Sequence, residues 1–366
     1  VGNVTLMMFY TTVTGWMLIY FFKSAIGDFA GLKPDAIGAA FGDMLASPGR
    51  QALAMIVVTL GALAVCAMGL RKGLERVTKW MMLFLFMLIL ALAFNSLTLE
   101  GAGKGVSFYL VPDFARMKSV GIAKVVVEAM NHAFFTLSLG IGSMAIFGSY
   151  IGKERSIMGE SVRVICLDTF VALMAGLIIF PACFTYNNGN VGAGPGLLFD
   201  TMASVFVNME GGRIWGSLFF LFMVFAALST VLGVLENILA MVREVTGWNR
   251  IKGSIVCGLV LIALATTTAL GYSVLSFQPF EAGTAWLDFW CFMVENILQP
   301  AGSLAYAFFC CFACASCCSR VRPPSLSSSL LPSPSCSSGV VPSPSCSSGV
   351  VPSPSSGWVF SPSPPG

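Results

Sequence analysis

Long apolar segments recur along the chain, separated by shorter polar connections. Most of them reach roughly 20 residues, the length that an α-helix needs to cross a bilayer. They are too long and too continuous for barrel strands, and helices are the other structure that satisfies its own backbone inside lipid. The pattern therefore predicts an all-α membrane protein with eight spans, at residues 4–26, 51–70, 79–98, 121–150, 161–186, 213–242, 253–274 and 286–311.

The charges in the connections predict the orientation of these spans. Three short basic connections alternate with longer connections at 27–50, 99–120 and 187–212. Because Lys and Arg are enriched in cytoplasmic loops, the first span is expected to run from the inside to the outside. The basic residues of the short connections are Arg71, Lys72, Arg76, Lys79, Lys153, Arg155, Arg163, Arg243, Arg250 and Lys252.

The composition excludes an ordinary soluble domain. Hydrophobic residues make up 56% and charged residues 10% of the chain, and the mean hydropathy is +0.84, whereas soluble domains carry about 25% charged residues. The net charge of +3 is no argument for nucleic-acid binding, because the basic residues are scattered in short loops. We expect no cleavable signal sequence. Because the chain opens at Val1 without a starting Met, we also expect that an N-terminal segment is missing.

The fourth predicted span contains an unusual stretch, Thr136–Ser143, which places two glycines and several hydroxyls at the middle of the membrane. Glycine weakens a helix, so Gly140-Ile141-Gly142 is a plausible point for the helix to unwind. Unwound backbone at this depth is tolerated only where it is buried or lines a cavity, as in transporters with broken helices. Taken by itself, this stretch is explained equally well by close packing of helices through small residues.

From Cys310 onward the composition changes to Ser, Pro and Cys, and a ten-residue sequence recurs unchanged. Such a tract cannot bury enough apolar surface to fold. We therefore predict a transmembrane domain over 1–311 and a disordered tail over 312–366, although a reading-frame error would also produce this tail. Cys314 and Cys317 have the spacing of a metal or redox pair, but no second pair or nearby His accompanies them.

Ionisable side chains inside the spans are candidates for function because they are costly in lipid. Asp168, in the fifth span, is interpreted as part of an ion site; the alternative is a hydrogen-bonded structural carboxylate. His132 is the one histidine, and we interpret it as a structural donor because no second metal ligand accompanies it. Glu236, near the inner end of the sixth span, either pairs with a basic loop or acts directly.

Hydroxyl groups in two spans are weaker candidates. Ser229 and Thr230 are adjacent, but such hydroxyls usually bond to the carbonyls of their own helix. Tyr10 is explained equally well as a packed tyrosine with its hydroxyl bonded. No spacing matches a zinc protease, a phosphate-binding loop or a Ser/His/Asp nucleophile, so we do not expect an enzyme.

Taken together, these motifs resemble the neurotransmitter:sodium symporter family, in its bacterial branch. The run Asn131–Ser143 is similar to the broken sixth helix of that family, and the stretch Phe225–Glu236 resembles its eighth helix. Tyr10–Trp16 resembles the third helix, and motifs within Gly194–Trp215 resemble the fourth extracellular loop and the entry to helix eight. The resemblance extends from Val1 to Phe309.

The resemblance implies a leucine-transporter-like inverted-repeat fold, in which the eight spans are helices three to ten of the usual twelve. Tyr10 would bond the substrate carboxylate, Phe135 would cover the substrate, and Ser138 would meet the amino group. The implied substrate-binding set is Leu6, Tyr10, Phe135, Thr136, Ser138, Ile141, Thr230 and Val234. Because its apolar members offer no charge partner, a neutral apolar or aromatic amino acid is expected.

The resemblance also implies two sodium sites and an outer gate. Oxygen ligands from hydroxyls, carbonyls and carboxylates suit an alkali cation. The implied sodium ligands are Thr136 and Asp168 in the first site, and Ala226, Ser229 and Thr230 in the second. Phe135 and Asp288 match the gate.

Some features depart from the family pattern. Asparagine occupies the position of Asp168 in chloride-dependent relatives, so a carboxylate there predicts chloride-independent transport. His132 replaces a common glutamine and receives a supporting role. Helices one and two are missing, and the tail replaces helices eleven and twelve. We therefore expect that the chain as given holds at best half of each site and does not transport by itself.

The resemblance thus implies sodium-coupled symport of a neutral amino acid across the cell membrane by a multi-pass protein. Sodium ions would serve as coupling ions, with no other cofactor and no nucleic-acid partner. The alternative is a non-transporting fragment or pseudogene product of such a symporter. The sequence specifies neither the amino acid nor the oligomeric state.

Overall fold

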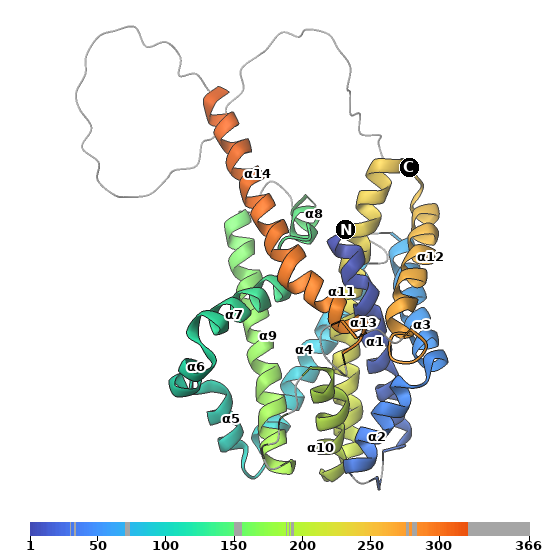
Figure 1. The fold of residues 1–366 in the computed structure, drawn as a ribbon, viewed down its shortest axis with the longest axis vertical. Coiled ribbons are helices and arrows are strands. Elements are labelled where there is room, and N and C mark those ends of the chain that lie inside the picture. The colour runs from blue at the N-terminus through green and yellow to red at the C-terminus, as the bar shows by residue number, and fades with distance from the viewer. Residues whose placement is uncertain are drawn as a thin grey trace, which may run out of the picture. The chain divides into compact units, whose positions relative to one another are not determined.

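The computed structural model describes residues 1–29, 31–32, 34–69, 74–149, 156–187, 189, 191, 194–275, 278–279 and 284–320. Every regular element in these ranges is a helix. The chain divides into two compact units, Val1–Ala315 and Ser316–Gly366. Figure 1 shows the helices of the first unit. Of the predicted disordered tail, residues 312–320 lie in a helix, Gln299–Arg320, and residues 321–366 lie outside the described residues, so the disorder of the latter stays a prediction.

Within the described residues, six helices are long and apolar enough to cross a membrane. A helix rises about 1.5 Å per residue, so even 20 residues span roughly 30 Å, the thickness of the hydrocarbon core. These helices match six of the eight predicted spans. They are α1 (Gly2–Ile26), α3 (Pro48–Ala67), α4 (Glu75–Leu97), α9 (Ile157–Tyr186), α11 (Gly212–Thr246) and α12 (Arg250–Ala269).

The remaining two predicted spans are interrupted. The fourth is divided into α7 (Ile122–Thr136) and α8 (Ser143–Ser149), so the predicted unwinding around Gly140 is confirmed. The eighth consists of α13 (Trp286–Phe292), the π-helical turn η3 (Met293–Leu298) and α14 (Gln299–Arg320). The sequence reading did not predict η3. Pro300 follows it and has no N–H for a regular helical bond, which accounts for a change of register there.

Shorter helices occupy the three longer connections that were predicted to be outside. The first contains α2 (Pro34–Leu45), and the second contains α5 (Ala102–Leu110) and α6 (Phe114–Val120). The third contains the π-turn η2 (Leu197–Thr201) and α10 (Met202–Asn208). In Figure 1 the ends of α2 and α10 lie near the same end of α1.

The core of the first unit forms where α1 packs against α3, α11 and α12. Trp16 and Tyr20 of α1 are fully buried, and the indole N–H of Trp16 donates to Oε1 of Gln51 at 2.9 Å. A Cβ at Gly15 would lie 2.9 Å from the backbone nitrogen of Met55. Glycine is therefore required at Gly15, because only a residue without a side chain allows α1 and α3 to approach so closely.

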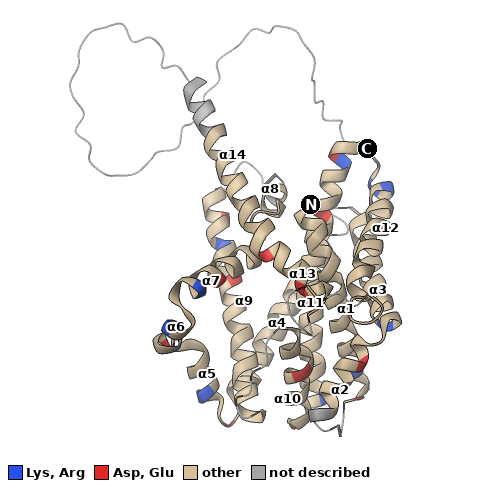
Figure 2. Ribbon diagram, viewed as in Figure 1, with Lys and Arg blue, Asp and Glu red and all other residues tan. Residues whose placement is uncertain are grey.

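Charges are placed as a membrane protein requires. In α3, α4 and α12 the charged residues lie only near the first turns, and Figure 2 shows the rest of these helices without Lys, Arg, Asp or Glu. Large apolar side chains of α4, such as Phe84 and Phe94, face outward, where lipid can solvate them. Of the loop residues behind the predicted orientation, Arg71, Lys72, Lys153 and Arg155 lie outside the described residues, so the orientation stays a prediction.

Candidate functional site

The interruption between α7 and α8 is the most irregular backbone within the described spans. Ser138 has φ 52°, Gly140 has φ 79° and Gly142 has φ 83°. Ser138 is the one non-glycine residue with positive φ among the described residues, and this left-handed conformation costs free energy for any residue with a Cβ. The backbone N–H of Leu139 donates to the carbonyl of Phe134 at 2.9 Å and closes the end of α7. Beyond this bond, the helical register is lost until α8 begins.

The unwound segment touches α14 through backbone atoms. A Cβ on Gly140 would lie 2.2 Å from the carbonyl oxygen of Gln299, and a Cβ on Gly302 would lie 2.1 Å from the carbonyl oxygen of Gly140. Real Cβ atoms do not approach other heavy atoms this closely, so both positions need glycine. The two glycines therefore hold the segment directly against the first turn of α14.

Two asparagines hold the other side of the segment. Nδ2 of Asn3, at the start of α1, donates to the carbonyl oxygen of Ile141 at 2.7 Å. Nδ2 of the buried Asn237, in α11, donates to the hydroxyl of Ser143 at 3.0 Å and lies 3.4 Å from the same Ile141 carbonyl. We refer to Asn3 and Asn237 as the asparagine clamp. It satisfies a carbonyl that the lost helical turn leaves without its usual partner.

The asparagine clamp was missed by the sequence reading, which considered only ionisable and hydroxyl side chains. The available signal was an amide in an apolar span: Asn237 directly follows Glu236 and is almost fully buried. A buried amide is expected to find hydrogen-bond partners. Nothing in the order of residues singles out the Ile141 carbonyl as its partner.

A cavity of about 330 Å³ lies beside the unwound segment, as expected where backbone leaves the helix at membrane depth. Ser138, Gly140 and Gly142 line it from the segment, and Ser303 and Tyr306 line it from α14. The hydroxyl of Ser303 is buried and has no hydrogen-bond partner among the described residues. The cavity therefore combines irregular backbone with one unused hydroxyl, and Ser138 is the one member of the predicted substrate-binding set among its described lining residues.

The residues predicted on helices three and eight of the family come together in the structure. The side chain of Tyr10 in α1 lies close enough to that of Thr230 in α11 for their hydroxyls to interact. The hydroxyl of Ser229 donates to the carbonyl oxygen of Ala226 at 2.7 Å, and that of Thr230 lies 3.5 Å from the same oxygen. Three oxygen atoms of the predicted second sodium site are thus adjacent on one face of α11, next to Tyr10.

The predicted apolar lining is largely buried. Leu6, Ile141 and Val234 are each no more than 7% exposed, and Phe135 is half-buried at the end of α7, where it packs against the core. Cγ2 of Ile141 lies 3.0 Å from the position of a Cβ on Gly2, so the unwound segment also contacts the start of α1.

The structure does not connect the residues of the first predicted sodium site. Thr136 is exposed, and its hydroxyl lies 3.4 Å from the carbonyl of Ala133 in its own helix. Asp168 is partly exposed on α9, and no described residue forms a hydrogen bond or ion pair with its carboxylate. The predicted gate residue Asp288 accepts a hydrogen bond from the backbone N–H of Ala285 at 2.7 Å and so caps α13. The first sodium site and the gate stay predictions.

Glu236 pairs with a basic residue, which is the first of the two roles considered for it from the sequence. Its carboxylate pairs with the guanidinium of Arg250 at the start of α12, and Nε of Arg250 donates to the carbonyl of Cys66 at 2.6 Å. This pair connects α11, α12 and α3 outside the predicted substrate site.

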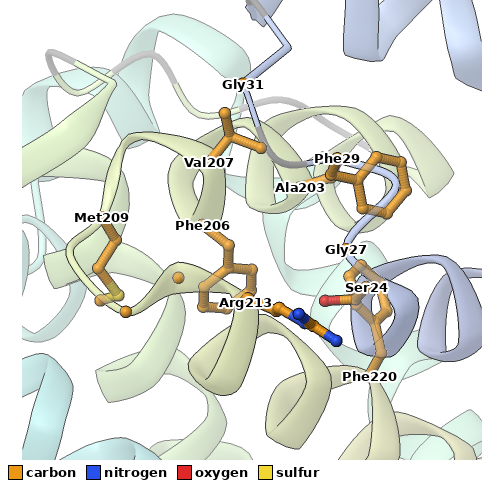
Figure 3. A pocket seen from close by; sticks show the side chains of 12 residues that line it. Ser24, Gly27, Phe29, Gly31, Ala203, Phe206, Val207, Met209, Arg213 and Phe220 are labelled. Carbon is orange, nitrogen blue, oxygen red and sulfur yellow. The ribbon is translucent and has the colours of Figure 1, made fainter.

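A second cavity, of about 280 Å³, lies apart from these residues (Figure 3). It is lined by the C-terminal end of α1, by α10 and by the start of α11. Figure 3 shows the guanidinium of Arg213 pointing toward Ser24. Nε and Nη2 of Arg213 donate to the carbonyl of Ala25 at 3.0 and 2.7 Å, so the arginine closes the end of α1.

Comparison with known proteins identifies the class to which this fold and site belong. The model of the sodium:neurotransmitter symporter family matches residues 37–302, and the chain belongs to this family of membrane transporters. An uncharacterized sodium-dependent transporter of Bacillus subtilis, YhdH, is 35% identical over 301 residues, which cover 82% of this chain and 65% of the relative. An uncharacterized sodium-dependent transporter of Haemophilus influenzae is 27% identical over 312 residues, covering 84% and 67%.

The crystal structure of MhsT in complex with L-phenylalanine has the same fold. It superposes with a TM-score of 0.76 at 32% sequence identity, covering 84% of this chain and 69% of MhsT. The predicted all-helical, leucine-transporter-like fold is thereby confirmed. The chain spans about two thirds of the length of the bacterial relatives and 51% of a third, archaeal relative from Methanocaldococcus jannaschii.

Proposed function

We propose that the protein carries out sodium-coupled symport of a neutral apolar or aromatic amino acid across the cell membrane. The observation that supports this most directly is the unwound segment 137–142, which lines a cavity and has Ile141 bonded by the asparagine clamp. Unwound helix offers backbone carbonyls and half-helix ends, which bind ions and zwitterions without titrating.

The proposed substrate selectivity rests on the apolar members of the predicted substrate-binding set. Leu6, Ile141 and Val234 are buried and apolar, and Phe135 adds an aromatic ring, so a charged substrate side chain would be desolvated without a partner. MhsT was crystallised in complex with L-phenylalanine, which agrees with this selectivity. We propose that the Tyr10 hydroxyl binds the substrate carboxylate and that Ser138 and the nearby carbonyls meet the amino group.

The proposed coupling to sodium rests on two groups of oxygen atoms that could bind the ion. The Ala226 carbonyl and the Ser229 and Thr230 hydroxyls would contribute to one site, and Thr136 and Asp168 to the other. Sodium binding would organise the unwound segment before the substrate completes the pocket, and a helical bundle would then rock against a scaffold that includes α1, α3, α11 and α12. Each charge that crosses 100 mV is worth about 2.3 kcal/mol.

The test is uptake by liposomes that contain the protein expressed from its complete reading frame. Uptake of labelled phenylalanine, leucine and lysine is measured with an inward sodium gradient and with sodium replaced by potassium. Sodium-dependent uptake of the two apolar amino acids, with lysine excluded, is expected. A folded protein that gives the same uptake in both salts contradicts the proposal, and a folded protein with no uptake supports the alternative of a non-transporting fragment.

Chloride independence is tested in the same liposomes. Because the Asp168 carboxylate would supply the negative charge that chloride provides in other members, replacing chloride by gluconate should leave uptake unchanged. In Asp168→Asn the charge is lost, so sodium activation should weaken and chloride should restore part of it. If gluconate abolished wild-type uptake, the role proposed for Asp168 would be wrong.

A further inference from the structure

An apolar groove runs between α3 and α12 on the outside of the first unit. Its volume is about 260 Å³, and its lining includes Leu63, Ala64 and Ala67 from α3 and Ser254, Ile255 and Leu259 from α12. At its floor the helices approach closely, because a Cβ on Gly258 would lie 2.3 Å from Cδ1 of Leu63. Ala64, Ile255 and Leu259 are exposed, so no described residue covers the groove.

The length of the groove matches one leaflet of a bilayer. Its lining on α12 runs from Ile251 to Ile262, and at about 1.5 Å per residue this distance is about 16 Å. Half of a hydrocarbon core of about 30 Å is about 15 Å. Both lining segments begin at the same end of the helix pair, the C-terminal end of α3 and the N-terminal end of α12. The loop charges predict that this end is cytoplasmic.

Charged and interfacial side chains stand at that end. Nζ of the exposed Lys252 lies 4.9 Å from the ring centroid of Trp248, and Trp and Lys are typical of the level of the lipid headgroups. Arg250 is occupied by Glu236, which leaves Lys252 as the cation nearest the groove among the described residues of α12. The exposed acid closest in sequence is Glu244, beside the exposed Arg243 at the end of α11.

The hydroxyl of Ser254 lies two residues beyond Lys252, about 3 Å further along α12. Ser254 is 3% exposed, lines the groove, and its Oγ has no hydrogen-bond partner among the described residues. A buried hydroxyl without a partner costs free energy that a ligand with an acceptor oxygen would recover. The ester oxygens of a phospholipid lie just below its phosphate, at the depth that Ser254 has relative to Lys252.

We propose that this groove is a binding site for one anionic phospholipid of the cytoplasmic leaflet. An acyl chain lies along α3 and α12, the ester region meets Ser254, and the phosphate meets Lys252. The cation at its mouth distinguishes an anionic from a zwitterionic headgroup.

The test is native mass spectrometry of the complete protein released from bilayers with equal amounts of phosphatidylglycerol and phosphatidylcholine that carry the same acyl chains. Wild type should retain one phosphatidylglycerol. Lys252→Gln should reduce the preference for phosphatidylglycerol about fivefold, the effect of one cation near an anionic headgroup. Ala64→Phe should fill the groove and abolish retention of both lipids.

Matched variants control for general effects on the membrane surface. Lys79→Gln removes an exposed cation near the start of α4, and Ala91→Phe enlarges an exposed alanine on the same helix; both should behave like wild type. Equal retention in wild type and Lys252→Gln would overturn the proposal. No retained lipid in wild type would also overturn it, because a segment of the chain or a second copy would then cover the groove. Neither outcome depends on whether the protein transports amino acids.

Discussion

Replacing Glu236 by alanine tests the ion pair that connects three of the long helices. The Glu236 side chain is 2% exposed and that of Arg250 is 18% exposed. Arg250 also donates to the carbonyl of Cys66 at 2.6 Å. Glu236→Ala therefore leaves a nearly buried guanidinium with one carbonyl partner and no counter-charge.

The size of the effect follows from this burial. Removing one partner of a buried ion pair costs about 3–5 kcal/mol, mostly because the remaining charge stays desolvated. Arg250 keeps its hydrogen bond to the Cys66 carbonyl, and its side chain is 18% exposed to solvent. We therefore expect a loss of unfolding free energy at the lower end of this range, about 3 kcal/mol. Replacing Glu236 and Arg250 together by methionine removes both charges, and the double variant should lie within about 1 kcal/mol of wild type.

Thermal unfolding in detergent measures this difference. Exposed thiols are first blocked, and a fluorogenic maleimide then reports exposure of the buried Cys66, Cys183 and Cys257. A loss of about 3 kcal/mol should lower the melting temperature by at least about 5 °C. Glu244→Ala, an exposed glutamate on the same helix, is the control and should shift it by less than about 1 °C.

Equal melting temperatures of Glu236→Ala and the Glu244→Ala control would refute a stabilising role of the ion pair. It is also refuted if the double methionine variant is less stable than Glu236→Ala, because the two charges would then not compensate one another.

Three further substitutions test the unwound segment. Gly140→Ala should destabilise the protein by more than about 2 kcal/mol, because it adds a Cβ at positive φ against the backbone of α14; Gly148→Ala, where the space is open, should be neutral or stabilising in the same melting assay. Asn237→Ala leaves Ser143 without its donor and should lower maximal uptake more than it raises the KM, whereas an unchanged uptake rate would remove the asparagine clamp from function. Tyr10→Phe should raise the substrate KM about tenfold, the value of roughly one hydrogen bond to a charged group; an unchanged KM in uptake assays would exclude the Tyr10 hydroxyl from the substrate site.

The elements that sequence alone predicted are those with a local cause. An apolar run of bilayer length has to form a helix, so six spans were found with bounds that differ by a few residues. The break was predictable because glycine at 140 and 142 lowers the cost of leaving the helix. The π-turn η3 was not predicted, because a proline such as Pro300 can end, kink or re-register a helix, and its position alone does not decide among these outcomes.

The candidate site was predictable in part for the same reason. Tyr10 and Thr230 were named from a family resemblance, and their contact follows from the packing of α1 on α11. Asn3 and Asn237 were overlooked because their common acceptor is a backbone carbonyl. Every residue has such a carbonyl, so the sequence does not indicate which one accepts the hydrogen bond. The partner of Glu236 was left open until Arg250 was seen beside it in space.

The contact between Gly140 and Gly302 has a mechanical consequence. Where two helices meet through side chains, rotamer changes absorb small shifts and the partners move somewhat independently. Here two backbones touch with no side chain between them, so a displacement of the unwound segment toward α14 has nowhere to be absorbed. A displacement of the unwound segment toward α14 must therefore push the first turn of α14 with it, whereas on the other side the amides of Asn3 and Asn237 can rotate and release Ile141.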